Sequence, residues 1–160
     1  MPAERDMVVL VCSGNTCRSP MAEVLLRAAL AKEGGKLAQL HIVSAGIGAY
    51  PGDAASDNAV KALARVGLDL SSHCSCPLDQ ATVDRAIAIF GMAAGHIDAL
   101  KSRFSNLPKV VQRLREQLPT TAGRDIPDPF GGNLGEYEAC RDSVIEAIPS
   151  VVACLKERFA

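Results

Sequence analysis

The sequence lacks a strong excess of charge and any long apolar run. Its 160 residues carry a formal net charge of -1, so we expect neither nucleic acid nor an anionic membrane surface as a partner. No apolar run reaches the ~18–20 residues that a membrane-spanning helix needs. The opening MPAERD also lacks the apolar core of a signal peptide. Together these absences predict a cytoplasmic protein that makes no use of a membrane.

Internal repeats, low-complexity tracts and linkers are also absent. Apolar residues make up 48% of the chain, which is typical of a globular protein. A length of 160 residues is enough for one domain with a sizeable core. We therefore expect a single domain over residues 1–160.

Several nucleotide-binding and metal-binding motifs are missing as well. The chain has no Walker loop, which would end in Gly-Lys-Ser/Thr, and no G-x-G-x-x-G fingerprint of dinucleotide folds. Its six cysteines are not spaced like the disulfide framework of a small secreted fold, so most are expected to be reduced. Cys74 and Cys76, even with His73, fall short of the four ligands of a structural zinc. We expect no metal and no cofactor.

The most informative stretch is VCSGNTCRSPMAE, residues 11–23. The apolar run before it predicts a strand, and Ser19-Pro20 suits the N-cap and first turn of a helix. The loop between them contains Gly14 and Asn15, which tolerate positive φ. A strand, a tight loop and a helix N-terminus in this order form a cradle of N–H groups for one oxyanion.

Two further residues give this cradle its chemistry. Arg18 has a planar guanidinium that can hold two phosphate oxygens at once. Cys12 lies where the strand ends, among N–H dipoles, a helix N-terminus and an arginine, surroundings that favour a reactive thiolate. The spacing Cys-x5-Arg-Ser therefore indicates a phosphate held against a sulfur nucleophile.

Strands and helices are expected to alternate along the chain, which predicts an α/β fold with a parallel sheet and helices on both faces. A Pro/Gly-rich loop over 119–135 precedes the last helix, in which Pro149 is expected to cause a kink or a split. The expected strands are 7–11, 40–45, 85–90 (opened by Thr82-Val83-Asp84) and 110–111, and the expected helices are 21–33, 58–66, 93–104 and 136–159.

The extended motif C-x-G-N-x-C-R-S-P-M-A-E resembles the active-site loop of the low-molecular-weight protein tyrosine phosphatases. That family includes the bacterial protein arginine phosphatases, which the chain resembles most. The resemblance covers nearly the whole chain and implies a flavodoxin-like four-stranded sheet of order 2-1-3-4. Ligands of such sheets bind beyond the carboxyl end of the first strand, where the strand order reverses, and Cys12 falls there.

The resemblance also implies roles for individual residues. Cys12 would attack phosphorus and form a cysteinyl-phosphate, and Asp128, in Asp-Pro-Phe-Gly-Gly, would be the general acid and later the base. Asp125 is an alternative acid that lacks the family context. The residues implied to bind phosphate or substrate are Ser13, Gly14, Asn15, Thr16, Cys17, Arg18, Ser19 and Phe130.

Ser19, Ser44 and His73 match the positions that hold the strained loop asparagine in the family, which is Asn15 here. Cys17 matches a cysteine that traps an oxidised nucleophile as a disulfide in relatives, although packing beneath the loop explains it equally well. His41 and His96 match nothing, so we expect them to be structural or solvent-facing.

Two positions favour a phosphorylated arginine side chain of a protein as the substrate. Thr16 replaces the bulky apolar residue frequent in the tyrosine phosphatases, and Phe130 stands in an acid loop like that of the arginine-specific members. The alternative is a tyrosine phosphatase with the same mechanism, and inorganic phosphate would be product and inhibitor of either.

More remote alternatives are an arsenate reductase and a non-catalytic phosphoprotein-binding module. The reductase needs two further cysteines after the third strand, and the chain has none between Ile87 and Ala139. A binding module would be expected to lose Cys12, Arg18 or Asp128, and all three are present.

Overall fold

The computed structural model describes residues 4–119 and 123–159. The expected loop over 119–135 therefore lies within the described residues except for 120–122. The strands are β1 (Met7–Cys12), β2 (His41–Gly46), β3 (Ala86–Gly91) and β4 (Val110–Arg113). The helices are α1 (Arg18–Glu33), α2 (Gly35–Ala38), α3 (Asp57–Ala64), α4 (Gln80–Arg85), α5 (Ala94–Arg103) and α6 (Leu134–Phe159).

The four strands form one parallel sheet of order β2-β1-β3-β4, which confirms the predicted topology. β1 is central because its residues Val8 to Val11 are apolar and fully buried, so neither of its faces can meet water. β2 pairs with one edge of β1 and β3 with the other. The strand order therefore reverses at β1, which ends at Cys12.

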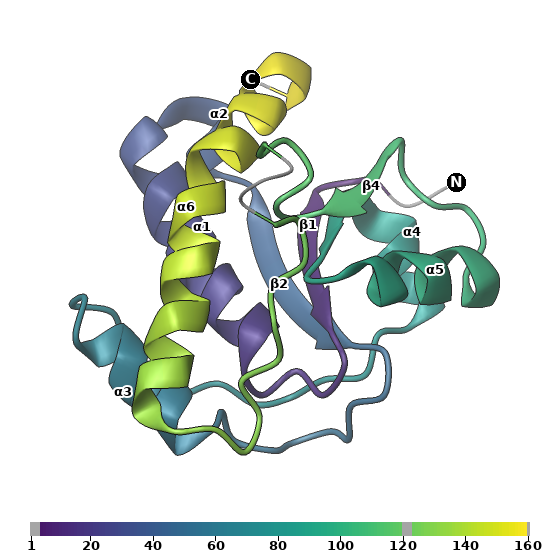
Figure 1. The fold of residues 1–160 in the computed structure, drawn as a ribbon. Coiled ribbons are helices and arrows are strands. Elements are labelled where there is room, and N and C mark those ends of the chain that lie inside the picture. Colours follow the sequence, from purple (N-terminus) through teal and green to yellow (C-terminus); the bar gives the residue numbers. More distant parts are fainter. Residues whose placement is uncertain (1–3, 120–122, 160) are drawn as a thin grey trace.

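Helices cover both faces of the sheet, as Figure 1 shows, with α1, α3 and α6 on one side and α4 and α5 on the other. Alternate residues of β1 point to opposite faces. Val8 and Leu10 join the larger apolar cluster, which includes residues of α1, α3 and α6. Val9 and Val11 join the smaller cluster with Val83 of α4 and Leu100 of α5. These two cores fix the carboxyl end of β1 between two layers of helices.

The start of the third strand was predicted wrongly. Thr82-Val83-Asp84 was expected to open the strand, but these residues belong to α4, and β3 begins at Ala86. The reason is local capping, since the Asp79 carboxylate accepts a hydrogen bond from the Thr82 N–H at 2.8 Å.

Of the two outcomes expected at Pro149, a kink or a split of the last helix, the split does not occur, because α6 continues through Pro149. Proline leaves the carbonyl four residues earlier without its helical donor, and that residue, Ile145, is 39% exposed. Buried side chains on both sides of Pro149, such as Val144 and Val151, hold the two halves on one core. Within residues 4–119 and 123–159, no helix is both long and apolar enough to cross a membrane.

Candidate active site

The loop between β1 and α1 wraps around the sulfur of Cys12. The Cys12 side chain is only 3% exposed. The N–H of Asn15 donates to the sulfur at 3.3 Å, and the Ser19 hydroxyl lies 2.9 Å from it. Because Ser19 Oγ accepts a hydrogen bond from Asn15 Nδ2, its own proton is free to point at the sulfur. Two donors therefore converge on the Cys12 sulfur, an arrangement that suits a negatively charged nucleophile.

Asn15 holds the loop in shape from within. Its backbone has a φ of 56°, and its side chain is completely buried. The amide Nδ2 donates to Ser19 Oγ and to Ser44 Oγ, both at 2.9 Å, while Oδ1 accepts from the Cys76 N–H at 2.9 Å. His73 Nε2 donates to the Asn15 carbonyl at 2.7 Å. The structure therefore brings together Asn15, Ser19, Ser44 and His73, as expected from the sequence.

The loop between β1 and α1 lies very close to Gly46, at the end of β2. A Cβ atom at Gly46 would lie 2.6 Å from the Ser13 carbonyl oxygen and 3.1 Å from the Asn15 Cβ. Only glycine fits there without moving the loop. The Gly48 N–H donates to the same Ser13 carbonyl at 3.0 Å, so the end of β2 and the residues after it support the loop from outside.

Cys17 is only 5% exposed, and its side chain packs against residues of the core. Its sulfur lies 3.1 Å from Ser56 Oγ and 3.3 Å from the Tyr137 hydroxyl of α6. Burial and the contact with Cys17 raise the pKa of Tyr137 to about 12, so the phenol stays protonated. The packing role expected for Cys17 is thus present, and the disulfide with Cys12 stays a prediction.

Arg18 connects the loop between β1 and α1, residues 13–17, which we call the phosphate loop, to the loop that carries Asp128. Its guanidinium is buried, with Nη1 donating to the Ile126 carbonyl at 2.9 Å. The Ile126 N–H donates in turn to the Met92 carbonyl, just beyond β3, at 2.8 Å. Nη2 of Arg18 lies 3.7 Å from Asp128 Oδ2. One arginine therefore connects the loop after β1 with the residues that follow β3 and with the Asp128 carboxylate.

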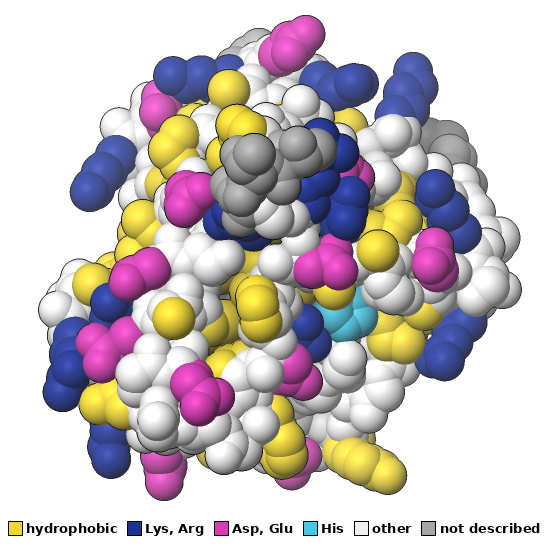
Figure 2. Space-filling model, viewed as in Figure 1, with side chains coloured by type: hydrophobic (Ala, Val, Ile, Leu, Met, Phe, Trp, Pro, Cys, Tyr) yellow, Lys and Arg dark blue, Asp and Glu magenta, His cyan; other side chains and the backbone are white. Residues whose placement is uncertain are grey.

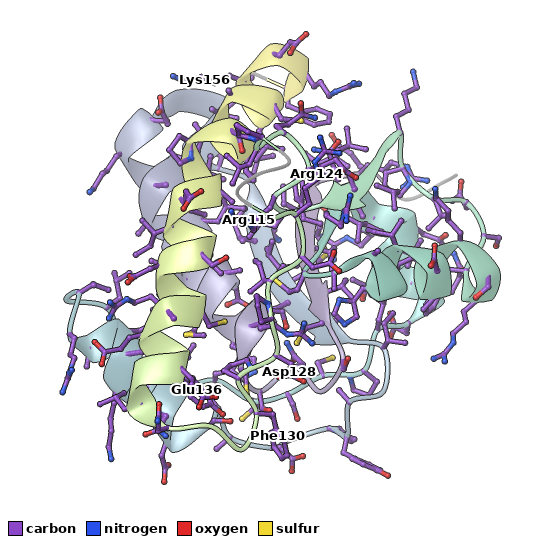
Figure 3. All side chains as sticks on the ribbon, viewed as in Figure 1. Arg115, Arg124, Asp128, Phe130, Glu136 and Lys156 are labelled. Atoms are coloured by element: carbon purple, nitrogen blue, oxygen red, sulfur yellow. The ribbon has the colours of Figure 1, made fainter. Side chains whose placement is uncertain are left out.

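Asp128 stands at the border between the site and the solvent. Its side chain is 52% exposed, and Oδ1 accepts from the Phe130 N–H at 3.1 Å, which fixes the carboxylate in a turn. Phe130 is 76% exposed. Figure 3 shows both residues in the loop that leads to α6, with Phe130 at the edge of the molecule and Arg115 and Arg124 well away from them.

Asp125, the alternative acid, is engaged elsewhere. Its carboxylate accepts from Arg113 Nη1 and from the Ala94 N–H, both at 3.0 Å. Burial raises the pKa of Asp125, but these hydrogen bonds outweigh burial and leave the pKa below its ordinary value. Asp125 is therefore tied to β4 and α5, whereas Asp128 faces Arg18.

A pocket of about 230 Å³ opens above Cys12. Its lining contains eight of the residues singled out in the sequence, namely Cys12, Ser13, Gly14, Thr16, Cys17, Arg18, Asp128 and Phe130. The other predicted residues, Asn15, Ser19, Ser44 and His73, support the loop from behind. Figure 2 shows acidic and basic side chains interspersed over this face of the molecule rather than gathered in one basic patch.

Sequence reasoning missed His96 as a member of the site. The ring is 7% exposed rather than solvent-facing, and its Nε2 lies 3.0 Å from Ser13 Oγ. One signal was available: His96 closely follows β3, and residues just after parallel strands gather at the edge where Cys12 lies. His41, by contrast, is well exposed.

The part of the chain that the structure describes contains no group of three His, Cys, Asp or Glu side chains that could hold a metal ion. The Arg18 guanidinium, a group that can bind an anion, lies in the lining of the pocket. The arrangement brings together a buried thiol, a buried guanidinium and a half-exposed carboxyl group.

Comparisons with known proteins agree with this geometry. The model of the family described as low molecular weight phosphotyrosine protein phosphatase matches residues 7–159. A protein-arginine-phosphatase of Bacillus subtilis is 34% identical, over 94% of this chain and 97% of that protein. A probable low molecular weight protein-tyrosine-phosphatase, EpsP of Ralstonia nicotianae, is 33% identical, over 91% of this chain and 92% of its own length.

Among solved structures, a YwlE arginine phosphatase mutant with a phosphorylated active-site serine superposes with a TM-score of 0.85. It shares 33% sequence identity and covers 96% of this chain and 97% of its own. Similarity therefore extends over nearly the whole fold, including both loops of the site.

Proposed function

The chain belongs to the low molecular weight phosphotyrosine protein phosphatase family of hydrolases, and on this premise we propose that it removes phosphate from phosphoarginine side chains of proteins. The observation that carries the proposal is the environment of Cys12. Its sulfur accepts hydrogen bonds at the base of a pocket that Arg18 and Asp128 also line. This combination supports attack on phosphorus rather than simple phosphate binding.

The proposed reaction has two steps. The Cys12 sulfur attacks phosphorus, an S–P bond forms, and the P–N bond to the guanidine breaks as Asp128 gives the leaving nitrogen a proton. A water molecule then attacks phosphorus, Asp128 takes a proton from it, and the S–P bond breaks to release phosphate. In both steps Arg18 and the loop N–H groups hold the other phosphoryl oxygens.

Thr16 and Phe130 support arginine as the phosphorylated residue. Both line the pocket, together with the carboxylate of Asp128, which gives a leaving guanidinium a polar and negatively charged neighbour. The relative named as an arginine phosphatase points the same way, but EpsP is of nearly equal identity. A tyrosine phosphatase with the same mechanism is therefore the second candidate.

The partners and place of action follow from the same chemistry. The substrate would be a phosphorylated protein. Inorganic phosphate would inhibit the enzyme, because the released product can bind again in the same cradle. The proposal includes neither nucleic acid nor a membrane as partner. A thiol nucleophile beside five further free cysteines works best in a reducing compartment, which favours the cytoplasm.

The deciding experiment compares kcat/KM on two peptides that differ only in phosphoarginine or phosphotyrosine. We expect a preference of at least about tenfold for phosphoarginine, because a site built for polar contacts rejects a group that lacks them. Thr16→Val, which keeps the shape but loses the hydroxyl, should reduce this preference. A phosphotyrosine preference would assign the chain to the tyrosine branch.

Two variants serve as controls for the mechanism. Cys12→Ser should abolish turnover, and Asp128→Asn should lower kcat by about 10²–10⁴ while leaving phosphate affinity close to wild type. Wild-type turnover by Cys12→Ser would refute the cysteinyl-phosphate. If the wild type hydrolyses neither peptide, arsenate reduction with a thioredoxin system is the next assay, and tight phosphopeptide binding without turnover would indicate a binding module.

A further inference from the structure

The geometry around His96 determines which ring nitrogen carries the proton. The Ala93 N–H donates to His96 Nδ1 at 3.1 Å, so Nδ1 must be an unprotonated acceptor. A neutral ring with a free Nδ1 carries its proton on Nε2. Nε2 lies 3.0 Å from Ser13 Oγ and therefore donates to it.

The surroundings of His96 keep the ring neutral. Burial and the nearby Arg18 guanidinium lower the pKa of His96 to about 4, although Asp128 and Asp125 oppose this shift. Arg113 of β4 faces the same region but is paired with Asp125 and Glu116. A second proton on the ring would also break the hydrogen bond from Ala93, since Nδ1 would no longer accept.

Because Ser13 Oγ accepts the hydrogen bond from His96, the Ser13 hydroxyl proton points away from the imidazole and is available to another acceptor. A hydroxyl has one donor proton, and here its oxygen already accepts from the imidazole. Ser13 lines the same pocket as Cys12 and Arg18, where a phosphoryl group would lie. In the proposed mechanism, the groups that hold the phosphoryl oxygens there, Arg18 and the loop N–H groups, are donors as well.

We propose that His96 is a positioning residue that holds the Ser13 hydroxyl as a hydrogen-bond donor to a phosphoryl oxygen. The proposal rests on the proposed function and extends it, because it assigns a role to the Ser13 side chain as well as to its backbone. His96 acts only through Ser13 and touches no reacting atom.

A glycine at the end of β3 makes this contact possible. A Cβ atom at Gly91 would lie 3.1 Å from the His96 Cβ and 2.9 Å from Ile97 Cδ1. The absence of a side chain lets the first turn of α5 approach the sheet edge, and this places the imidazole beside the phosphate loop.

Two substitutions separate the link to Ser13 from the helix cap. In His96→Asn the shorter side chain can still accept from the Ala93 N–H but does not reach Ser13. In His96→Gln the longer amide can do both, as glutamine does in a capping box. We expect His96→Asn to lower kcat/KM by about tenfold, with His96→Gln within about threefold of wild type.

A double-mutant cycle with Ser13→Ala tests whether His96 acts through Ser13. Ser13→Ala should lose as much as His96→Asn, and the double variant should lose no more than Ser13→Ala alone. The inhibition constant of inorganic phosphate should rise by a similar factor in all three. Additive losses, or an unchanged phosphate affinity with only a lower Tm, would reduce His96 to a helix-capping role and overturn the proposal.

Nitrogen NMR of the imidazole gives a readout that does not depend on turnover. In the wild-type protein we expect the Nε2–H tautomer throughout the range from pH ~5 to ~8, without titration. A ring that titrates near its ordinary pKa, or that carries its proton on Nδ1, would refute the inference even in an active enzyme. If the wild type hydrolysed neither peptide, phosphate binding and NMR would still test the link.

Discussion

The two sides of the phosphate loop are each held by a histidine, but in different ways. His73 comes from the loop after α3 and donates to a backbone carbonyl, that of Asn15, at 2.7 Å. His96 comes from the first turn of α5 and contacts a side chain, the Ser13 hydroxyl, at 3.0 Å. The contact of His73 fixes the backbone of the loop at Asn15, whereas the contact of His96 orients only the Ser13 hydroxyl group.

The two sides of the loop therefore have different roles. On the side of Asn15, four hydrogen bonds fix a buried residue of positive φ, so the shape of the cradle depends on them. On the side of Ser13, one hydrogen bond adjusts a donor at the pocket wall. We therefore expect substitutions on the first side to affect stability and activity together, and substitutions on the second side to affect mainly activity.

The largest effect is expected for Asn15→Ala. It leaves the Cys76 N–H without its buried acceptor and deprives Ser19 and Ser44 of a donor. It also places alanine at positive φ. The free energy of unfolding should fall by about 3–5 kcal/mol, since each unsatisfied buried group costs about 1–3 kcal/mol. Loss of the loop shape should lower kcat/KM by about 10² or more, measured by urea denaturation and phosphopeptide hydrolysis.

Two matched variants separate strain from hydrogen bonding. Asn15→Gly accepts positive φ but lacks the amide, so it should recover only the ~1–2 kcal/mol of backbone strain. Asn106 has the same φ of 56° but is exposed on the surface. Asn106→Ala should therefore lose stability without losing activity. If Asn15→Gly were as active as wild type, the side-chain network would have no part in shaping the cradle.

The side of the loop held by His73 was predictable from the sequence, and the side held by His96 was not. Asn15, Ser19, Ser44 and His73 were identified because they belong to one recognisable pattern. The sheet was predictable because its strands are short apolar runs. His96 contacts a partner 83 positions away and lies in the sequence Ala-Ala-Gly-His, which has no periodicity that marks it.

The wrong start of the third strand has a local cause. Thr82 and Val83 favour a strand by side-chain type, but the Asp79 cap and the burial of Val83 select a helical turn. The contact of Tyr137 with Cys17 joins residues 120 positions apart. Such contacts depend on how α6 packs against the sheet, which no stretch of the sequence specifies alone.

A smaller effect, confined to the side of Ser13, is expected for Gly91→Ala. The new methyl group would lie 2.9 Å from Ile97 Cδ1, the end of a flexible side chain, and 3.1 Å from the His96 Cβ, which must move by a few tenths of an ångström. Moving the imidazole away from Ser13 should reproduce the loss of about tenfold in kcat/KM expected for His96→Asn. Steady-state kinetics of Gly91→Ala alone and combined with His96→Asn would show whether the two losses coincide.

Gly95→Ala is the matched control for this substitution. Gly95 also lies near the start of α5, but a Cβ there meets no atom within 4 Å. Alanine should stabilise the helix by about 0.5–1 kcal/mol and leave hydrolysis unchanged. Equal activity of Gly91→Ala and Gly95→Ala would mean that the approach of α5 to the loop has no catalytic consequence.

The smallest expected effect is a difference in the pH dependence of stability between wild type and His96→Asn. In the folded protein the pKa of His96 is lowered to about 4 from its ordinary 6.5, mainly by burial and then by Arg18. Between these pH values the unfolded chain binds a proton that the folded protein excludes. The wild type should therefore lose stability as pH falls from 6.5 to 4, and the variant should lose less.

The slope difference for one proton is at most ~1.4 kcal/mol per pH unit, and solvent that reaches the ring makes it smaller. Above pH 6.5 the two curves should run parallel, because His96 is then neutral in both folded and unfolded chains. Arg18, Asp125 and Asp128 are common to both proteins, so their direct contributions largely cancel in the comparison. Urea denaturation at a series of pH values measures the difference. Parallel curves over the whole range would show that folding does not lower the pKa of His96.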